Sequence, residues 1–202
     1  MKMTRLIATS TLLATTAFAA QSAMAYQAGD LYVRGGFEKA DPTSDNGDVL
    51  DQDLSISDEN GFAYGLGYLF HDKFGVELNG SESMEHDLSV EGGGIGSVER
   101  TPVNVMLNYY PLGGVADARV HPYAGVGMNY THFSDESFGG DLDSSYGAAA
   151  QVGVDLSVTD NLMVGTYARY ADVDADIDVD GHDVGEAELD PVTIGAGVTY
   201  RF

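Results

Sequence analysis

The sequence is defined first by what it lacks: it has no cysteine, no tryptophan and few basic residues. The absence of cysteine excludes a disulfide framework and a thiolate metal site. Nine Lys and Arg stand against 32 Asp and Glu, which gives a formal net charge of −23. Such a surface repels nucleic acid, so we expect no nucleic-acid partner. After the first twenty-five residues no apolar run approaches the roughly 18 residues that a membrane-spanning helix needs.

The first segment has the pattern of an export signal. Lys2 and Arg5 form a basic start, residues 6–20 are mostly apolar, and residues 23–25 (Ala-Met-Ala) form a small-x-small cleavage site. The apolar part is too short and too rich in Thr and Ser to cross a bilayer as a helix. We expect residues 1–25 to be a cleaved signal peptide, which leaves residues 26–202 as a single domain.

The last segment alternates strictly between two kinds of side chain. From Val192 to Phe202 the even positions are apolar and the odd positions are small or polar. This two-residue period predicts a β-strand with one apolar face. A terminal aromatic residue after such a strand resembles the signal that the outer-membrane assembly machinery recognises. Together with the export signal, the strand predicts a barrel of the Gram-negative outer membrane.

Eight stretches in all show this alternation. They span residues 31–37, 62–70, 74–79, 103–109, 124–130, 147–156, 162–170 and 192–202. Three of the connections are short and four are long, at residues 39–60, 80–101, 133–145 and 171–190, and the long ones hold most of the acids. Outer-membrane barrels have this layout, with short periplasmic turns and long extracellular loops. We therefore predict an all-β, eight-stranded antiparallel transmembrane β-barrel with both termini on the periplasmic side.

Five charged residues occupy positions that face the lumen of this barrel: Arg34, Glu77, Asp155, Arg169 and Arg201. An eight-stranded barrel is barely wide enough for its own side chains, so we expect these charges to be paired. Arg34 and Arg201 belong to the first and last strands, which are neighbours once the barrel closes, and Glu77 and Asp155 are the carboxylates available to them. We interpret the set as a plug of salt bridges, with a polar gate as the functional alternative.

The last long connection carries a second candidate site. Residues 172–180 alternate Asp with an apolar residue and extend the seventh stretch with the opposite polarity. If the strand continues, the apolar residues point into the mouth of the barrel and form a vestibule for a hydrophobic substrate: Val173, Ala175, Ile177 and Val179. A bulge or a solvated ribbon is the alternative, and the pattern leaves both open.

The same segment contains the opening of a calcium loop. Asp176, Asp178 and Asp180 are spaced as calcium ligands and are followed by Gly, but the twelfth position is Ala187 where Glu is required. We expect no cofactor and leave open only weak calcium binding in this loop. The five histidines lack metal-ligating spacing and the chain has no nucleophile elbow, so we predict that the protein is not an enzyme.

Several stretches resemble the outer membrane protein W family. They are residues 74–78 (Phe-Gly-Val-Glu-Leu), 121–131, 147–155 and 189–191, with the terminal Tyr-Arg-Phe. One departure is the lack of Trp, so that Tyr and Phe must form the aromatic belts at the membrane interfaces. The resemblance implies an eight-stranded barrel with a narrow, largely apolar channel that passes small hydrophobic molecules and releases them sideways into the membrane. Aliphatic-hydrocarbon uptake and stress response are roles associated with the family.

These observations predict a monomeric outer-membrane channel for small hydrophobic molecules, surrounded by the lipid bilayer and lipopolysaccharide. The alternative is a structural or adhesive surface barrel that transports nothing and acts through its acidic loops. A secreted soluble barrel with an internal ligand site is a third hypothesis. It requires an apolar interior and a polar exterior, whereas here the glycines and charges share one face and Tyr and Phe share the other.

Overall fold

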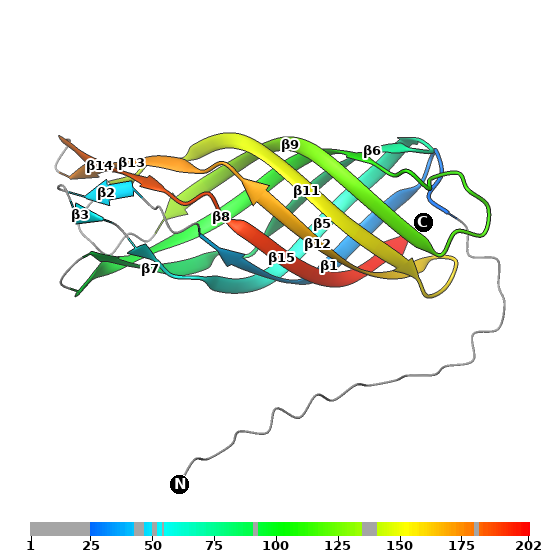
Figure 1. Cartoon of the computed structure of the whole chain (residues 1–202), viewed down its shortest axis with the longest axis horizontal. Helices are drawn as coiled ribbons and strands as arrows, with labels where there is room; N and C mark the ends of the chain where they lie inside the picture. Colours follow the sequence, from blue (N-terminus) through cyan, green and yellow to red (C-terminus); the bar gives the residue numbers. More distant parts are fainter. Residues whose placement is uncertain are drawn as a thin grey trace, which may run out of the picture.

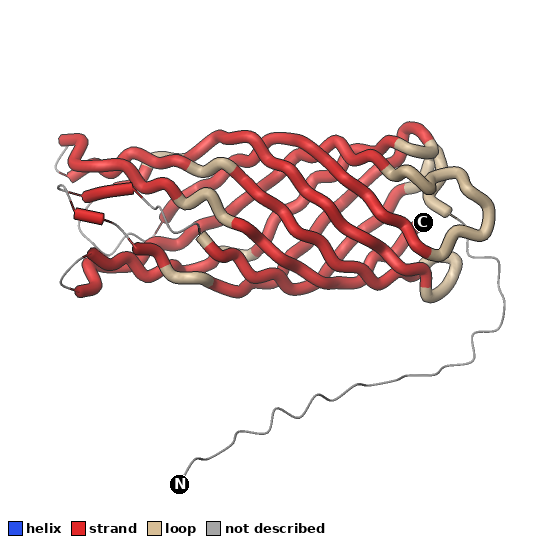
Figure 2. Tube along the Cα trace, viewed as in Figure 1, coloured by secondary structure: helices blue, strands red, loops and turns tan. Residues whose placement is uncertain are grey.

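The computed structural model describes residues 25–42, 47–49, 52–53, 55–90, 93–134, 141–179 and 182–202. The described chain consists of strands and the segments that join them (Figure 2). Within these ranges no helix has the length and apolar character needed to cross a membrane. The expected signal peptide, apart from Ala25, lies outside the described residues, and its cleavage stays a prediction.

Eight long strands close into one antiparallel barrel. They are β1 (Leu31–Asp41), β5 (Glu59–His71), β6 (Phe74–Ser81), β8 (Gly93–Tyr109), β9 (Val120–Ser134), β11 (Ser145–Ser157), β12 (Leu162–Ala171) and β15 (Val192–Arg201). The order around the wall is β8-β6-β5-β1-β15-β12-β11-β9, and β9 pairs with β8 to complete the ring. The predicted fold is confirmed, and each of the eight alternating stretches corresponds to one of these strands.

The two ends of the barrel differ in structure (Figure 1). The short turns between β5 and β6, β8 and β9, and β11 and β12 lie at the end that holds the C-terminus. At the opposite end a second sheet consists of β2 (Gly47–Val49), β3 (Gln52–Asp53), β10 (Asp141–Leu142), β13 (Asp174–Val179) and β14 (His182–Glu188). There β7 (Met84–Val90) pairs with β8 and carries β4 (Ser55–Ile56) at its other edge. The expected long loops are thus partly strand, because alternation continues beyond the predicted stretches.

Alternation along each strand separates the lumen from the outer surface. Along β8, and at the residue that follows it, every second side chain is buried and faces the lumen. These side chains are Val98, Arg100, Pro102, Asn104, Met106, Asn108 and Tyr110. Between them Val105, Leu107 and Tyr109 are exposed on the outside, with Val105 57 % exposed. An apolar outer wall around a closed ring of backbone hydrogen bonds is what a lipid environment requires of β-structure.

Aromatic side chains gather at both ends of the outer wall. At the turn end the rings of Phe74 and Tyr109 lie 5.2 Å apart, and Tyr200 contacts the terminal Phe202 at 5.0 Å. At the other end two further exposed pairs meet across neighbouring strands: Phe37 with Phe62 at 5.8 Å, and Tyr130 with Tyr146 at 4.8 Å. Tyr and Phe therefore occupy the positions where membrane barrels carry aromatic girdles.

The turn end of the lumen is filled by residues 26–30, which we call the N-terminal plug. Tyr26 is fully buried, and its carbonyl oxygen accepts a hydrogen bond from the Gly114 amide at 2.7 Å. The Gly29 amide donates to the Leu69 carbonyl at 2.7 Å, and the Leu69 amide donates to the Asp30 carbonyl at 2.9 Å. The plug is thus tied to β5 and to the turn that precedes β9.

Candidate functional site

The lumen contains a polar network centred on Arg34 of β1. Its Nη2 donates to Asp155 Oδ2 at 2.8 Å, its Nη1 to the Tyr123 hydroxyl at 2.5 Å, and its Nε to Thr199 Oγ1 at 3.0 Å. The Nη1 also lies 3.9 Å from Glu77 Oε2. One guanidinium is therefore the positive partner of two buried carboxylates, and buried charges require such partners.

The two carboxylates accept further hydrogen bonds from other strands. Glu77 accepts from the Tyr32 hydroxyl and, at 2.8 Å, from Asn79 Nδ2. Asp155 accepts from the hydroxyl of Tyr26 in the N-terminal plug at 2.9 Å. These bonds satisfy oxygen lone pairs that burial would otherwise leave without water. The network thereby joins the plug to β1, β6 and β11.

Three lumen tyrosines reach this region because each lies opposite a glycine on the adjacent strand. The register pairs are Tyr32 with Gly67, Tyr123 with Gly153, and Tyr167 with Gly195. A Cβ atom added to any of these glycines would lie 2.4 Å or less from a ring carbon. The glycines therefore provide the space in which the rings cross the neighbouring strand.

A chain of amide side chains lines the wall above Glu77. Asn104 donates to Asn79 at 3.0 Å, Asn129 donates to Asn104 at 2.9 Å, and Thr131 donates to Asn129 at 2.7 Å. The chain runs across β6, β8 and β9. Its donors and acceptors satisfy one another within the lumen.

A second charged group joins β12 to β1, nearer the long-loop end than Arg34. Arg169 Nη1 of β12 lies 3.6 Å from Glu38 Oε2, and the Tyr167 hydroxyl donates to the same oxygen at 2.6 Å. Between this group and the Arg34 network is a cavity of about 10 Å³, lined in part by Arg34, Glu77 and Arg169. That volume is about the minimum for one water molecule. The space between these two charged groups therefore holds little more than one water.

Arg201 belongs to a separate ion pair at the turn end. Its Nη1 lies 3.3 Å from Asp30 Oδ2, and its Nη2 donates to the Asp160 carbonyl at 2.5 Å. The expected pairing with Glu77 or Asp155 does not occur. Arg201 lies opposite Tyr32, two residues nearer the rim than the Arg34 level, where Asp30 and turn carbonyls are closer partners.

The lumen lining changes from polar to apolar toward the long-loop end, where buried side chains form one cluster that we call the apolar mouth. Its members are Leu88, Val98, Phe133, Ala149, Ala171, Val173, Ala175 and Leu189, and Met106 continues the cluster down β8 to the level of Glu77. Val173 is 0 % exposed and Ala175 4 % exposed, so the structure places these two predicted vestibule residues on the lumen side. The side chains of Ile177 and Val179 lie outside the described residues.

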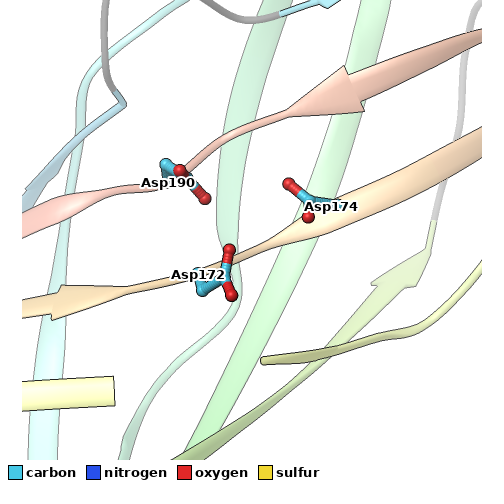
Figure 3. Close-up of side chains that lie close together, drawn as sticks. All are labelled: Asp172, Asp174 and Asp190. Carbon is cyan, nitrogen blue, oxygen red and sulfur yellow. The ribbon is translucent and has the colours of Figure 1, made fainter. Parts of the chain in front are cut away.

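The outward face of the same segment carries three carboxylates (Figure 3). Oxygens of Asp172, Asp174 and Asp190 all lie within 4.8 Å of one another. Asp190 accepts hydrogen bonds from the Val173 amide at 2.9 Å and from the Tyr170 hydroxyl at 2.8 Å. These bonds give Asp190 a structural role at the junction of β12, β13 and β15.

The predicted calcium loop follows this cluster along β13. The side chains of Asp176 and Asp178, and the whole of Asp180, lie outside the described residues. Weak calcium binding there stays a prediction.

Known proteins share this architecture and sequence. The OmpW family model matches residues 27–202. The chain belongs to the OmpW family. Outer membrane protein W of Vibrio cholerae serotype O1 is 32 % identical over 164 residues, which cover 72 % of this chain and 75 % of the relative. Outer membrane protein W of Escherichia coli K12 is 32 % identical over 193 residues, which cover 87 % and 89 %.

The solved OprG outer membrane protein of Pseudomonas aeruginosa has a similar fold. Its crystal structure superimposes with a TM-score of 0.79 at 28 % identity, covering 88 % of this chain and 98 % of OprG. This OmpW-family chain is accordingly an outer-membrane β-barrel, and its exposed apolar wall faces the lipid bilayer. The resemblance inferred from the sequence is confirmed.

Three charged residues of this OmpW-family lumen were not predicted from the sequence. Asp30 and Glu38 lie just outside the first predicted stretch, and Arg100 falls in a predicted long loop, yet all three are buried inside the barrel. The sequence feature that could have revealed Glu38 and Arg100 was the two-residue period itself. It continues through residues 36–40 of β1 and residues 98–102 of β8, beyond the stretches with the strongest apolar alternation.

Proposed function

We propose that this OmpW-family barrel is a channel that admits small hydrophobic molecules through the outer membrane, and that it is not an enzyme. The observation that carries the proposal is the apolar mouth, where Val98, Phe133, Val173 and Leu189 meet on the lumen side. The lumen of a barrel that passes water and ions is polar. An apolar lining at the long-loop end instead suits the entry of an apolar molecule.

The polar network beneath the mouth determines the rest of the route. Arg34, Glu77 and Asp155 form a buried, hydrogen-bonded group, and the adjoining cavity measures about 10 Å³. An apolar solute gains nothing from these groups and would have to separate ions from their partners. In our proposal the molecule therefore leaves sideways through the wall into the bilayer, as the family resemblance implies.

We further propose that the barrel acts as a monomer in contact with lipopolysaccharide, and that the assembly machinery recognises β15. In β15 the exposed residues Val192, Ile194, Val198 and Tyr200 alternate with lumen residues up to the terminal Phe202. This is the apolar face that an assembly factor meets before the strand pairs with β1 and β12.

Solute uptake into vesicles tests the channel. Proteoliposomes containing the mature barrel should take up a radiolabelled medium-chain alkane or alcohol faster than protein-free vesicles of the same lipid. Val173→Asn places an amide in the apolar mouth and should slow uptake, since burying an unpaired amide is unfavourable. Asp174→Asn changes the neighbouring exposed residue and should leave uptake unchanged. Equal uptake with and without the wild-type protein would refute the channel.

One observation favours a second function, that of a structural or adhesive surface barrel. The middle of the described lumen is packed with side chains, and the charge of −23 is concentrated in the long connections. An adhesive barrel would show no uptake in the vesicle assay, and its attachment to an anionic surface would depend on divalent cations. If the vesicles still take up the alkane or alcohol after a chelator has removed divalent cations, this alternative is contradicted.

A further inference from the structure

Among the described residues, the pairing of charges inside the barrel leaves one arginine without a carboxylate. The described lumen holds four arginines and four acids: Arg34, Arg100, Arg169 and Arg201, with Asp30, Glu38, Glu77 and Asp155. Arg34 pairs with both Glu77 and Asp155, whereas Arg169 and Arg201 each pair with one acid. Arg100 is 2 % exposed and forms no ion pair within the described part of the chain.

The surroundings of Arg100 do not neutralise it. Glu38 is the acid that acts on its charge, but Glu38 is already held by Arg169 and Tyr167. Arg169 adds a second positive charge nearby and opposes that of Arg100. Of the polar atoms on Arg100, the buried Nε has no hydrogen-bond partner. A buried cation in this state is energetically costly, and an anion that joined it would remove that cost.

Two more unpartnered polar atoms lie on the adjoining strands. Ser81 Oγ, at the end of β6, and His86 Nε2, on β7, are both buried and have no hydrogen-bond partner in the part of the chain that the structure describes. The other nitrogen of His86 lies 2.7 Å from the Ser57 carbonyl and donates to it, so Nε2 of the neutral ring is an acceptor. Arg100 and Ser81 supply donors. A carboxylate matches this set, because its two oxygens accept from both donors, and His86 can take up one proton from water on binding and then donate it through Nε2.

Arg100 also lies at the boundary between the polar lumen and the apolar mouth. On β8 the next lumen residue toward the turn end after Pro102 is Asn104 of the amide chain, and the next toward the long-loop end is Val98 of the apolar mouth. Phe133, another mouth residue, is the register partner of Arg100 on β9. A molecule with its head at Arg100 would therefore have its tail among Val98 and Phe133.

We propose that Arg100, with Ser81 and His86, is the head-group site for an amphipathic carboxylate whose alkyl tail occupies the apolar mouth. The proposal rests on the proposed channel and names the class of molecule that the channel prefers. A charge-assisted hydrogen bond in a desolvated site is stronger than a neutral one. We therefore expect decanoate to bind at least about tenfold more tightly than decanol, which has a similar tail and no charge.

Binding to the mature barrel in lipid nanodiscs tests this preference, with empty nanodiscs subtracted to remove partitioning into the bilayer. The ligands are decanoate, decanol and acetate, each titrated at neutral pH. Decanoate binding that exceeds decanol binding about tenfold, with acetate weaker than both, supports the proposal. Equal binding of decanoate and decanol overturns it, and acetate binding as tight as decanoate would show a site for small anions only.

Variants locate the preference at Arg100. Arg100→Met removes the charge with little change in volume and should make decanoate and decanol bind equally, while Arg100→Lys should keep part of the preference. Arg119→Met removes the same charge from an exposed position on the periplasmic turn and should behave like the wild type. A preference for decanoate that survives in Arg100→Met overturns the assignment, provided that the variant shows the heat-modifiable gel mobility of a folded barrel.

The uptake assay separates this inference from the proposed function. If the barrel carries alkane and alcohol into vesicles but binds decanoate no better than decanol, the channel stands and the head-group site is wrong. If it carries neither alkane nor decanoate, the channel itself is wrong.

Discussion

Replacement of Arg34 by Met is the sharpest test of the polar network. Arg34 lies 2.8 Å from Asp155 and 3.9 Å from Glu77, and all three side chains lie in the lumen. Met keeps the length of the apolar stem but removes the cation and its three hydrogen bonds. Two carboxylates then remain buried in the same space without a positive partner, so the Arg34→Met barrel should be strongly destabilised.

The size of the expected destabilisation follows from the burial of Arg34 and its two carboxylate partners. Removing one partner of a buried ion pair costs about 3–5 kcal/mol, and Arg34 is the partner of two acids. We expect a loss of about 4 kcal/mol in the free energy of unfolding. With a urea dependence of about 2 kcal/mol per molar, the unfolding midpoint should fall by about 2 M.

Urea titration of the barrel in lipid vesicles, followed by circular dichroism and by the gel mobility of the folded form, measures this shift. Lys39→Met serves as the control, because Lys39 pairs with Asp58 at 2.6 Å while both side chains are about half exposed. An exposed ion pair of this kind contributes little to the free energy of unfolding, so Lys39→Met should unfold at the same urea midpoint as the wild type.

A compensated variant checks the physical reason. When Glu77→Gln and Asp155→Asn are added to Arg34→Met, none of these three positions carries a buried charge, and the midpoint should return to within about 0.5 M of the wild type. If Arg34→Met unfolds at the wild-type midpoint, or if the compensated variant is no more stable than Arg34→Met, the network does not depend on charge neutralisation.

Three other predictions concern separate parts of the barrel. Burial and the nearby charge of Arg100 lower the pKa of His86 from 6.5 to about 4. The β7 hairpin should therefore have its full stability above pH 6.5. Its free energy of unfolding should fall by up to about 3 kcal/mol as the pH drops from 6.5 to 4. Hydrogen exchange of β7 amides, corrected for intrinsic rates, should show this loss in the wild type and not in His86→Gln. Tyr26→Ala should destabilise the barrel by about 3–5 kcal/mol through loss of a buried ring, whereas Tyr26→Phe should lose only about 1 kcal/mol, both from thermal unfolding. Gly195→Ala should displace the Tyr167 ring and cost about 1–3 kcal/mol in urea titration, whereas Gly94→Ala, where the nearest atom is 3.8 Å away, should be tolerated.

The strands could be predicted from the sequence because one physical constraint acts along the whole chain. A wall between lipid and lumen forces alternation with a period of two, and turns interrupt it. The same two-residue period placed Arg34, Glu77 and Asp155 on the lumen face. That face continues past the end of β12, where Val173 follows Arg169 and Ala171 as a buried residue.

Other features depend on distances that periodicity does not contain. Glu38 lies one residue beyond the first predicted stretch, and Arg100 lies where β8 extends beyond its apolar stretch, so neither was predicted to face the lumen. The N-terminal plug has no period at all, and its place depends on the fit of Tyr26 against Tyr110, with ring centroids 4.7 Å apart. Likewise, the carboxylate that pairs with Arg201 could not be chosen from the sequence without the position of that plug.

The position of the N-terminal plug affects the order in which the barrel is completed. Asp30 directly precedes β1, and its ion pair with Arg201 joins the first strand to the last at the single seam where the two ends of the chain meet. Tyr26 is bound to the turn that precedes β9, and Gly29 is bound to Leu69 of β5. The ion pair between Asp30 and Arg201 requires β15 to lie beside β1, so it forms when this seam closes. A barrel that opens between β1 and β15 must therefore break this ion pair.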